Sequence, residues 1–231
     1  FVRLGANLRA VVMDEPLLNV LLNPDMNRLG GNDEKFEFAL EHTADYIRKV
    51  HGAHPTLAVG DIEVFPTMRA DFVIRWIDAL DARLAEKGTR RLDFFRLDVN
   101  WLNLAMIQEG YTPAEGWREV KRINDHCKAV GLPFSLIYWP ADVLTFEDKD
   151  RLPIMDSRSD KAWHDQIMAM ARMYWEVGGR PDQYVMESWV RVGPKETPMP
   201  PTVLPERHVF SFTRCLKELY ENYAGPQLEG K

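Results

Sequence analysis

Five short apolar runs alternate with amphipathic stretches of helical length, and this alternation constrains the fold more than any other feature of the chain. The runs cover 9–14, 56–62, 92–98, 133–138 and 183–187, at intervals of about 46, 36, 41 and 50 residues. Each interval holds one helix-like pattern. The order predicts parallel strands joined by right-handed helical crossovers.

The helix-like patterns predict helices over 33–50, 69–87, 113–130, 160–177 and 207–222. Thr112-Pro113 and Gly131 are start and stop signals for the third of these. A segment of about twenty residues separates the fourth strand from the next helix, and we interpret it as a functional loop or lid because simple connections are shorter.

Two architectures satisfy the alternation: an open, doubly wound sheet, and five of the eight units of a (β/α)8 barrel. A dinucleotide-binding open sheet would carry a glycine-rich turn after its first strand, and the chain has none there. Polar residues at several strand ends favour the barrel. We therefore predict one α/β domain over 1–231, a parallel (β/α) barrel with five visible units. We expect its upstream strands to be truncated or lost.

Composition and charge exclude several classes of partner. The net charge of −6 leaves no basic stripe to neutralise phosphates, so we expect no nucleic-acid partner. No stretch approaches the ~20 apolar residues of a membrane span, so we expect no membrane partner. The chain opens on Phe1 without a signal peptide. Its location and oligomeric state stay open, with secretion or a periplasmic location after signal-peptide removal as one alternative.

Acidic and aromatic residues gather where the predicted strands end. Ligands of α/β folds bind beyond the carboxyl ends of the strands, so such residues are site candidates. Carboxylates beside flat rings are typical of a carbohydrate site. The candidates, in strand order, are Asp14 and Glu15; Asp61 and Glu63; Asp98, Asn100 and Trp101; Tyr138 and Trp139; Glu187 and Trp189.

Glu15 and Glu63 are the predicted catalytic pair. Pro16 fixes the exit of the chain after Glu15, which holds that carboxylate at the rim of the sheet. Alternation places Asp61 and Glu63 on one face of the second strand. Glycosidases use two carboxyl groups, about 5 Å apart for retention or about 6.5–9.5 Å apart for inversion, and neighbouring strands would bring Glu15 and Glu63 together.

Asp14-Glu15-Pro16 resembles the Asn-Glu-Pro motif that closes the fourth strand of clan A retaining glycoside hydrolases, which are TIM barrels. The resemblance implies that Glu15 is the acid/base, with Asp14 in place of the asparagine. In that clan the nucleophile lies three strands later, where this chain has Tyr138-Trp139. Two alternatives stay open: Glu15 pairs with Glu63, or Glu63 pairs with Glu187 while Asp14-Glu15 binds substrate.

These patterns predict a glycoside hydrolase that acts on a polysaccharide or oligosaccharide. Glu63 would be its nucleophile or base, and the other strand-end residues would bind the sugar. No histidine motif suggests a metal, so we expect neither a metal nor a cofactor. The alternatives are a non-catalytic carbohydrate-binding barrel and a carboxylate-metal sugar isomerase or lyase.

Overall fold

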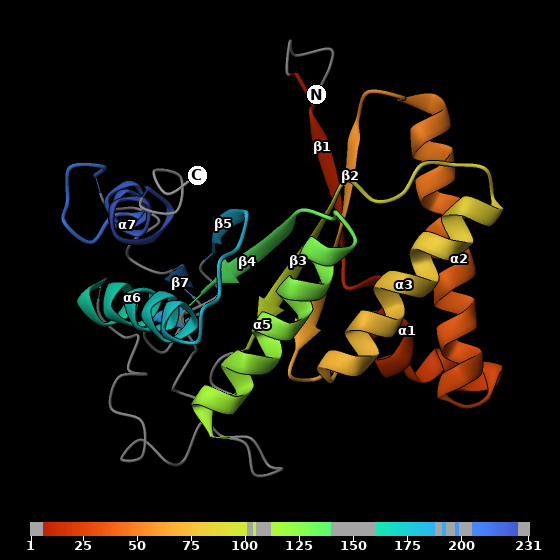
Figure 1. Cartoon of the computed structure of the whole chain (residues 1–231), viewed down its shortest axis with the longest axis horizontal. Helices are drawn as coiled ribbons and strands as arrows, with labels where there is room; N and C mark the ends of the chain where they lie inside the picture. The colour runs from red at the N-terminus through yellow and green to blue at the C-terminus, as the bar shows by residue number, and fades with distance from the viewer. Residues whose placement is uncertain are drawn as a thin grey trace. The chain divides into compact units, whose positions relative to one another are not determined.

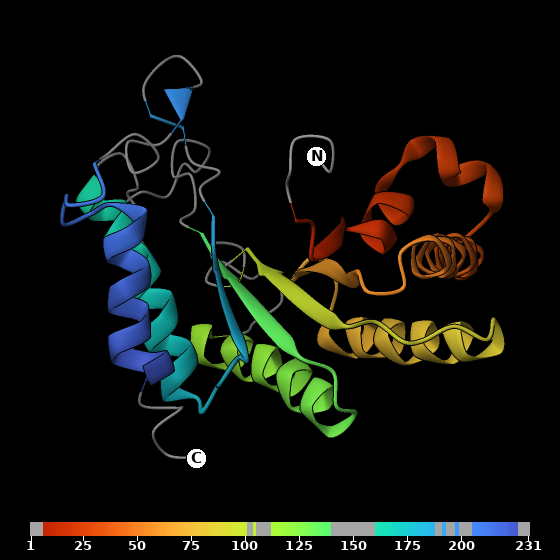
Figure 2. The same cartoon turned by 90° about the horizontal axis from the view of Figure 1, so that it is seen from above.

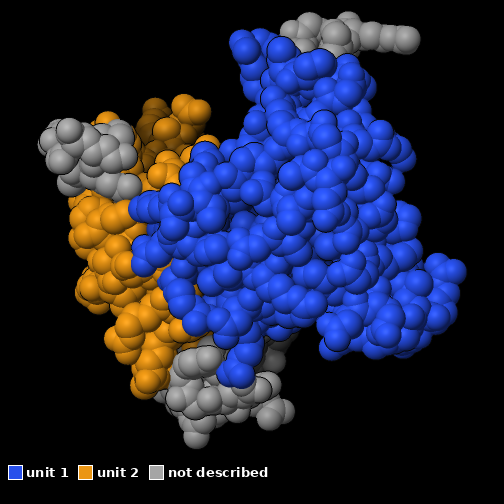
Figure 3. Space-filling view, turned by 45° about the vertical axis from the view of Figure 1, so that its right-hand side comes forward, with its two compact units in different colours: residues 1–98, 122–135 blue, residues 99–121, 136–231 orange. Residues whose placement is uncertain are grey.

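The computed structural model describes residues 7–100, 104, 112–139, 160–187, 191–192, 197–198 and 205–225. The chain divides into two compact units (Figure 3). The first comprises 1–98 and 122–135, and the second comprises 99–121 and 136–231. The boundaries between the units fall inside one helix and two strands.

Five parallel strands form one sheet in the order β1-β2-β3-β4-β5, so each strand pairs with the next strand along the chain (Figure 1). Their bounds are β1 Ala10–Asp14, β2 Ala58–Phe65, β3 Phe94–Val99, β4 Phe134–Tyr138 and β5 Gln183–Met186. A short antiparallel pair, β6 Arg191–Val192 and β7 Thr197–Pro198, forms a second sheet. The parallel α/β class predicted from the sequence is therefore confirmed for the described strands.

Helices lie between the strands and after the last of them. They are α1 Pro16–Leu22, α2 Asn32–Ala53, α3 Ala70–Glu86, α5 Pro113–Ala129, α6 Asp160–Glu176 and α7 Phe212–Leu219, with the 3-10 helix η2 Pro24–Leu29 and the π-helix η6 Tyr220–Ala224. A capping box starts α5: the Thr112 N–H donates to Glu115 Oε2 at 2.6 Å, and the Glu115 N–H donates to Thr112 Oγ1 at 3.3 Å. No helix in the described part of the chain is long and apolar enough to cross a membrane.

The predicted elements and the observed ones differ mainly around β1 and β2. No helix was predicted between Pro16 and Leu29, where α1 and η2 lie. The predicted second strand ended at Ile62, whereas β2 continues to Phe65 and therefore contains Glu63. The last helix begins at Phe212, later than predicted. The remaining helix and strand ends agree within about three residues, which is the usual uncertainty of such boundaries.

The two faces of β2 have different surroundings. The Trp76 indole N–H, from α3, donates to Asp61 Oδ2 at 2.7 Å, so the Asp61 side chain points toward that helix. Because side chains alternate along a strand, Glu63 shares this face, which we call the helix-covered face. Gly60 belongs to the opposite face, where the Phe94 ring of β3 occupies the space beside its Cα.

Alternation assigns three further residues to the opposite face. Arg96 and Asp98 lie two and four residues after Phe94 on β3, and the Arg96 guanidinium stacks over the Phe94 ring at 4.9 Å. Asp14 is the register partner of Ile62 and lies on that face of β1. The acids at the ends of the first three strands are thus divided between two faces.

An aromatic cluster joins the helices that cover the first face. The Phe36 ring of α2 packs edge to face on Trp76 and on Phe72, with ring centroids 5.6 and 5.5 Å apart. Figures 1 and 2 show α2 and α3 side by side. Arg83 bridges the same two helices outside the cluster, pairing with Glu37 at 3.0 Å and with Glu41 at 2.7 Å. The layer over β2 is therefore a packed core with a charged rim.

Gly60→Ala tests the close approach of β2 and β3. The new Cβ would lie 2.0 Å from the Phe94 ring, so we expect the free energy of unfolding to fall by about 1–3 kcal/mol, measured by urea denaturation. Gly52→Ala is the matched control, because no atom lies within 4 Å of its Cβ position and the residue is in α2. That change should be neutral or stabilising by up to about 1 kcal/mol. Equal effects of the two changes would contradict the packing described.

Candidate functional site

Glu63 holds the first turn of α1. Its Oε1 accepts the Leu17 backbone N–H at 2.7 Å and its Oε2 accepts the Leu18 N–H at 3.3 Å. Pro16 has no N–H, and the Asn19 N–H already donates to the Glu15 carbonyl at 2.9 Å. One carboxylate therefore satisfies every N–H that the start of the helix leaves without an intrahelical partner. Glu63 is 0 % exposed.

Lys35 holds the other end of the same helix. Its ammonium donates to the Leu21 carbonyl at 3.1 Å and to Asn27 Oδ1 at 2.7 Å, and the residue is buried. The positive charge of Lys35 at the C-terminus matches the helix dipole, while the Glu63 carboxyl oxygens accept the N–H groups at the N-terminus. A helix of only seven residues is thus fixed from both ends by side chains of β2 and α2.

Asp61 and Glu63 form a buried acid pair. Burial raises the pKa of Asp61 to about 7, although the hydrogen bond from Trp76 lowers it. Burial and the neighbouring Asp61 raise the pKa of Glu63 well above its usual value, against the lowering effect of the two backbone N–H donors. Asp61 Oδ1 is buried and has no hydrogen-bond partner, which favours a protonated carboxyl there.

Glu15 has an unusual backbone conformation. Its φ of 51° and ψ of 49° lie in the left-handed region, and no other non-glycine residue in the described ranges has a positive φ. Such a conformation costs about 1–2 kcal/mol in a residue with a Cβ. The Glu15 N–H continues the β1–β2 ladder by donating to the Ile62 carbonyl at 2.9 Å. Glu15 therefore lies at the carboxyl end of β1, between the last ladder bond and α1.

The Glu15 carboxyl is half-buried beside another acid. Burial raises its pKa, and the charge of Asp14 raises it further. A carboxyl that keeps its proton at a higher pH is what a general acid requires. Glu15 in turn contributes to the raised pKa of Glu63, so the two predicted catalytic residues interact electrostatically.

The remaining predicted residues of the first unit lie on the opposite face. Asp14 is exposed and Asp98 is half-buried. Asp98 lies at the carboxyl end of β3 as predicted, but it faces away from the side of the sheet that buries Asp61 and Glu63. Asp98 and Glu63 therefore lie on opposite faces of the sheet.

The second unit holds four more of the predicted residues. Tyr138 is 1 % exposed and its ring stacks on Tyr184 of β5, with centroids 5.8 Å apart and planes 7° apart. Burial raises the pKa of Tyr138 well above its usual value. The Glu187 N–H donates to the Tyr138 carbonyl at 3.0 Å, which extends the β4–β5 ladder. Asn100, Trp139 and Glu187 are each half-buried at strand ends, whereas Trp101 and Trp189 lie outside the described residues.

Two residues outside the predicted site support the acids. Lys35 anchors α1 and Trp76 donates to Asp61. Trp76 is one of the buried residues of α3, and a tryptophan N–H that is buried usually finds an acceptor. The local sequence does not indicate the anchoring role of Lys35, because the groups that accept its hydrogen bonds belong to α1 and η2. In the described part of the chain, no three or more His, Cys, Asp or Glu side chains are grouped to hold a metal ion.

Comparison of the chain with protein-family models, with curated proteins and with solved structures found no significant match.

Removing the Glu63 carboxylate should loosen α1. Glu63→Ala leaves the Leu17 and Leu18 N–H groups unpaired in a dry environment, and each unpaired donor costs about 1–3 kcal/mol. Glu63→Gln keeps one acceptor oxygen and should cost less than the alanine change. Urea denaturation measures both, with Glu176→Ala on the exposed side of α6 as a control within about 0.5 kcal/mol of the parent. An equal effect of Glu63→Ala and Glu176→Ala would contradict the anchoring role.

Asp61 should make stability depend on pH. Its pKa rises from the usual 3.8 to about 7 on folding, so the folded protein holds a proton that the unfolded chain releases between these values. The free energy of unfolding should therefore decrease as the pH rises through this window.

Asp61→Asn cannot ionise but can still accept the Trp76 N–H, so it should reduce this slope. Glu63 contributes a slope of the same sign, so part of it should remain. Melting temperatures between about pH 4 and pH 8 measure the change, and an unchanged slope in Asp61→Asn would argue against a neutral Asp61.

Proposed function

We propose that the protein is a glycoside hydrolase that binds a saccharide beyond the carboxyl ends of its parallel strands and uses Glu15 as general acid/base. The observation that carries this proposal is the placement of Glu15. A half-buried carboxyl with a raised pKa, held in a left-handed backbone conformation, stands at the carboxyl end of β1. Backbone strain of this kind is typical of functional positions.

The fixed surroundings of Glu15 support its role. Pro16 and α1 follow it directly, and Glu63 and Lys35 hold that helix at both ends. The position of a general acid has to be reproducible to a fraction of an ångström, because it must lie within hydrogen-bond reach of the leaving oxygen. The anchored helix limits the movement of the residue that precedes it.

Glu63 does not enter the proposal as the nucleophile. Both of its oxygens accept backbone N–H groups and the residue is 0 % exposed, so a sugar carbon has no route to it. We assign Glu63 the role of positioning α1 and Glu15. The second carboxylate is then Asp98, the half-buried acid at the end of β3 in the same unit as Glu15. Asp14 would bind sugar hydroxyls.

In the proposed reaction, Glu15 donates its proton to the glycosidic oxygen as the bond to the anomeric carbon breaks. The second carboxylate either attacks that carbon or activates the water that does so. Water ends the reaction as the hydroxyl of the released sugar, and the acid recovers its proton.

Glu15→Gln tests the acid. It should depress kcat/KM by about 100-fold or more on alkyl glycosides, whose leaving oxygen needs a proton, and much less on 4-nitrophenyl glycosides. The alkaline limb of the pH–rate profile should disappear, because that limb reports loss of the Glu15 proton. A panel of aryl glycosides first identifies the sugar. Equal losses on both kinds of leaving group would mean that Glu15 does not donate the proton.

Further variants separate the remaining roles. Asp98→Ala on an activated aryl glycoside with added azide tests whether Asp98 is the nucleophile, since a variant that lacks the nucleophile regains turnover through the small anion. Glu15→Gly relieves the left-handed backbone and should leave stability unchanged or slightly higher, while turnover is lost. A large loss of stability in Glu15→Gly would make Glu15 a structural residue.

A non-catalytic carbohydrate-binding protein is the second candidate. The observation that favours it is the engagement of Glu63 by two backbone N–H groups, which removes this carboxyl of the neighbouring strand as a catalytic partner of Glu15. Saccharide binding without turnover on any glycoside of the panel would select this function over hydrolysis.

A further inference from the structure

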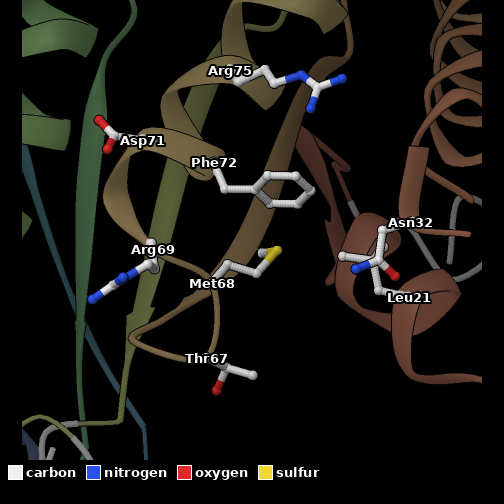
Figure 4. Close-up of a pocket in the computed structure, with 8 residues that line it drawn as sticks. All are labelled: Leu21, Asn32, Thr67, Met68, Arg69, Asp71, Phe72 and Arg75. Atoms are coloured by element: carbon white, nitrogen blue, oxygen red, sulfur yellow. The ribbon is translucent and has the colours of Figure 1, made fainter. Parts of the chain in front are cut away.

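A pocket of about 460 Å³ opens between the end of α1, the first turn of α2 and the connection from β2 to α3 (Figure 4). Leu21 and Asn32 line one side, and Met68, Phe72 and Arg75 line the other. The volume falls within the range of small-molecule sites, about 300–1,000 Å³. The β2–α3 connection follows the carboxyl end of β2, which is the end where α/β folds bind ligands.

The pocket has an apolar wall. Met68 is 4 % exposed, and Phe72 is half-buried with its ring fixed edge to face against Phe36 at 5.5 Å. Figure 4 shows Met68, Phe72 and Arg75 pointing toward the side where Leu21 and Asn32 lie. A flat ring held in this way offers a surface to the C–H face of a sugar, as aromatic residues do in carbohydrate sites.

Arg75 supplies one fixed positive charge beside that wall. Its guanidinium lies 4.4 Å from the centroid of the Phe36 ring and 5.9 Å from that of Phe72, which restricts the orientation of the side chain. Its partner is Asp33, with N–O distances of 3.4 and 3.5 Å to a single carboxylate oxygen. Asp33 is 85 % exposed, so this pair contributes little and is easily exchanged.

Arg75 is also the charged group aimed at this side of the pocket. Asp71 pairs with Arg122 at 2.8 Å, and Figure 4 shows Asp71 and Arg69 pointing away from the ring of Phe72. A ligand anion that replaced Asp33 could take both guanidinium N–H groups in the bidentate geometry that arginine forms with carboxylates and sulfates.

We infer that this pocket binds an anionic sugar unit, with the sugar ring on Phe72 and Met68 and its acidic group on Arg75. The inference rests on the proposed function and names its substrate class as an acidic saccharide. Glu15 and Leu21 are separated by six residues of helix, about 9 Å along its axis. An oligosaccharide can span that distance, so the pocket would serve as a subsite for a sugar near the bond that is cleaved. The acidic group can be a uronate carboxylate or a sulfate ester.

Binding of matched monosaccharides to the full chain tests the inference. Methyl glucuronide, glucose 6-sulfate and methyl glucoside share a ring and differ in charge, and titration followed by NMR or calorimetry gives their Kd values. We expect at least one anionic sugar to bind about tenfold or more tighter than methyl glucoside, in line with a hydrogen bond to a charged group. The better of the two anions identifies a uronate or a sulfated substrate.

Two variants should move the affinity in opposite directions. Arg75→Gln should weaken binding of the anionic sugar about tenfold and leave the affinity for methyl glucoside unchanged. Asp33→Asn should strengthen binding of the anionic sugar, because the competing carboxylate is gone. Arg48→Gln is the matched control, an exposed arginine of α2 that pairs with Asp45 at 3.6 Å and should have no effect. Circular dichroism confirms that each variant is folded.

The outcomes separate this inference from the proposed function. Equal binding of neutral and anionic sugars, or an affinity that Arg75→Gln and Asp33→Asn leave unchanged, would overturn the subsite even if Glu15→Gln abolished hydrolysis. Anionic binding that follows both variants, without turnover on any acidic glycoside, would uphold the subsite and overturn the hydrolase.

Discussion

The hydrogen bonds from the first turn of α1 to Glu63 are the constraint on which the rest of the site depends. Burying a carboxyl group in a packed layer is unfavourable unless hydrogen-bond donors are present, and the Leu17 and Leu18 N–H groups donate to Glu63. The same bonds fix where α1 begins, and therefore where Glu15 stands. Asp61 below it on the strand shares the burial, so both acids have raised pKa values and hold protons more strongly than exposed carboxyls.

This constraint divides the strand-end acids into two functional groups. Glu63 and Asp61 face the helices and accept hydrogen bonds inside this layer, Asp61 from Trp76 and Glu63 from the first turn of α1. Asp14 and Asp98 lie on the opposite face of the sheet. In a parallel α/β fold, chemistry is carried by polar groups that remain reachable at the carboxyl ends of the strands. Accessibility therefore distinguishes a supporting acid from a reacting one.

The proposed hydrolase and the proposed subsite depend on the same short helix. Glu15 precedes α1 and Leu21 lies in its last turn, where it lines the pocket beside Phe72 and Arg75. Fixing both ends of α1, through Glu63 and Lys35, therefore fixes the acid and one wall of the pocket together. The protein carries a net charge of −6, so recognition of an acidic sugar would need a local positive group, and the stacking of Arg75 on Phe36 provides one.

The sequence by itself determined the α/β class, the five parallel strands, most helix bounds and the gathering of acids at strand ends, because these follow from local periodicity, capping residues and the polarity of strand termini. Only the tertiary structure decided which acids are reachable. The sequence placed Asp61 and Glu63 at the rim of the sheet, whereas in the structure Trp76 and α1 cover them. The helix α1 has too few residues to give a periodic sequence pattern. The N–H groups that donate to the buried carboxyl groups of Asp61 and Glu63 lie about 15 and 45 residues away in the sequence. No local sequence pattern predicts contacts between residues so far apart.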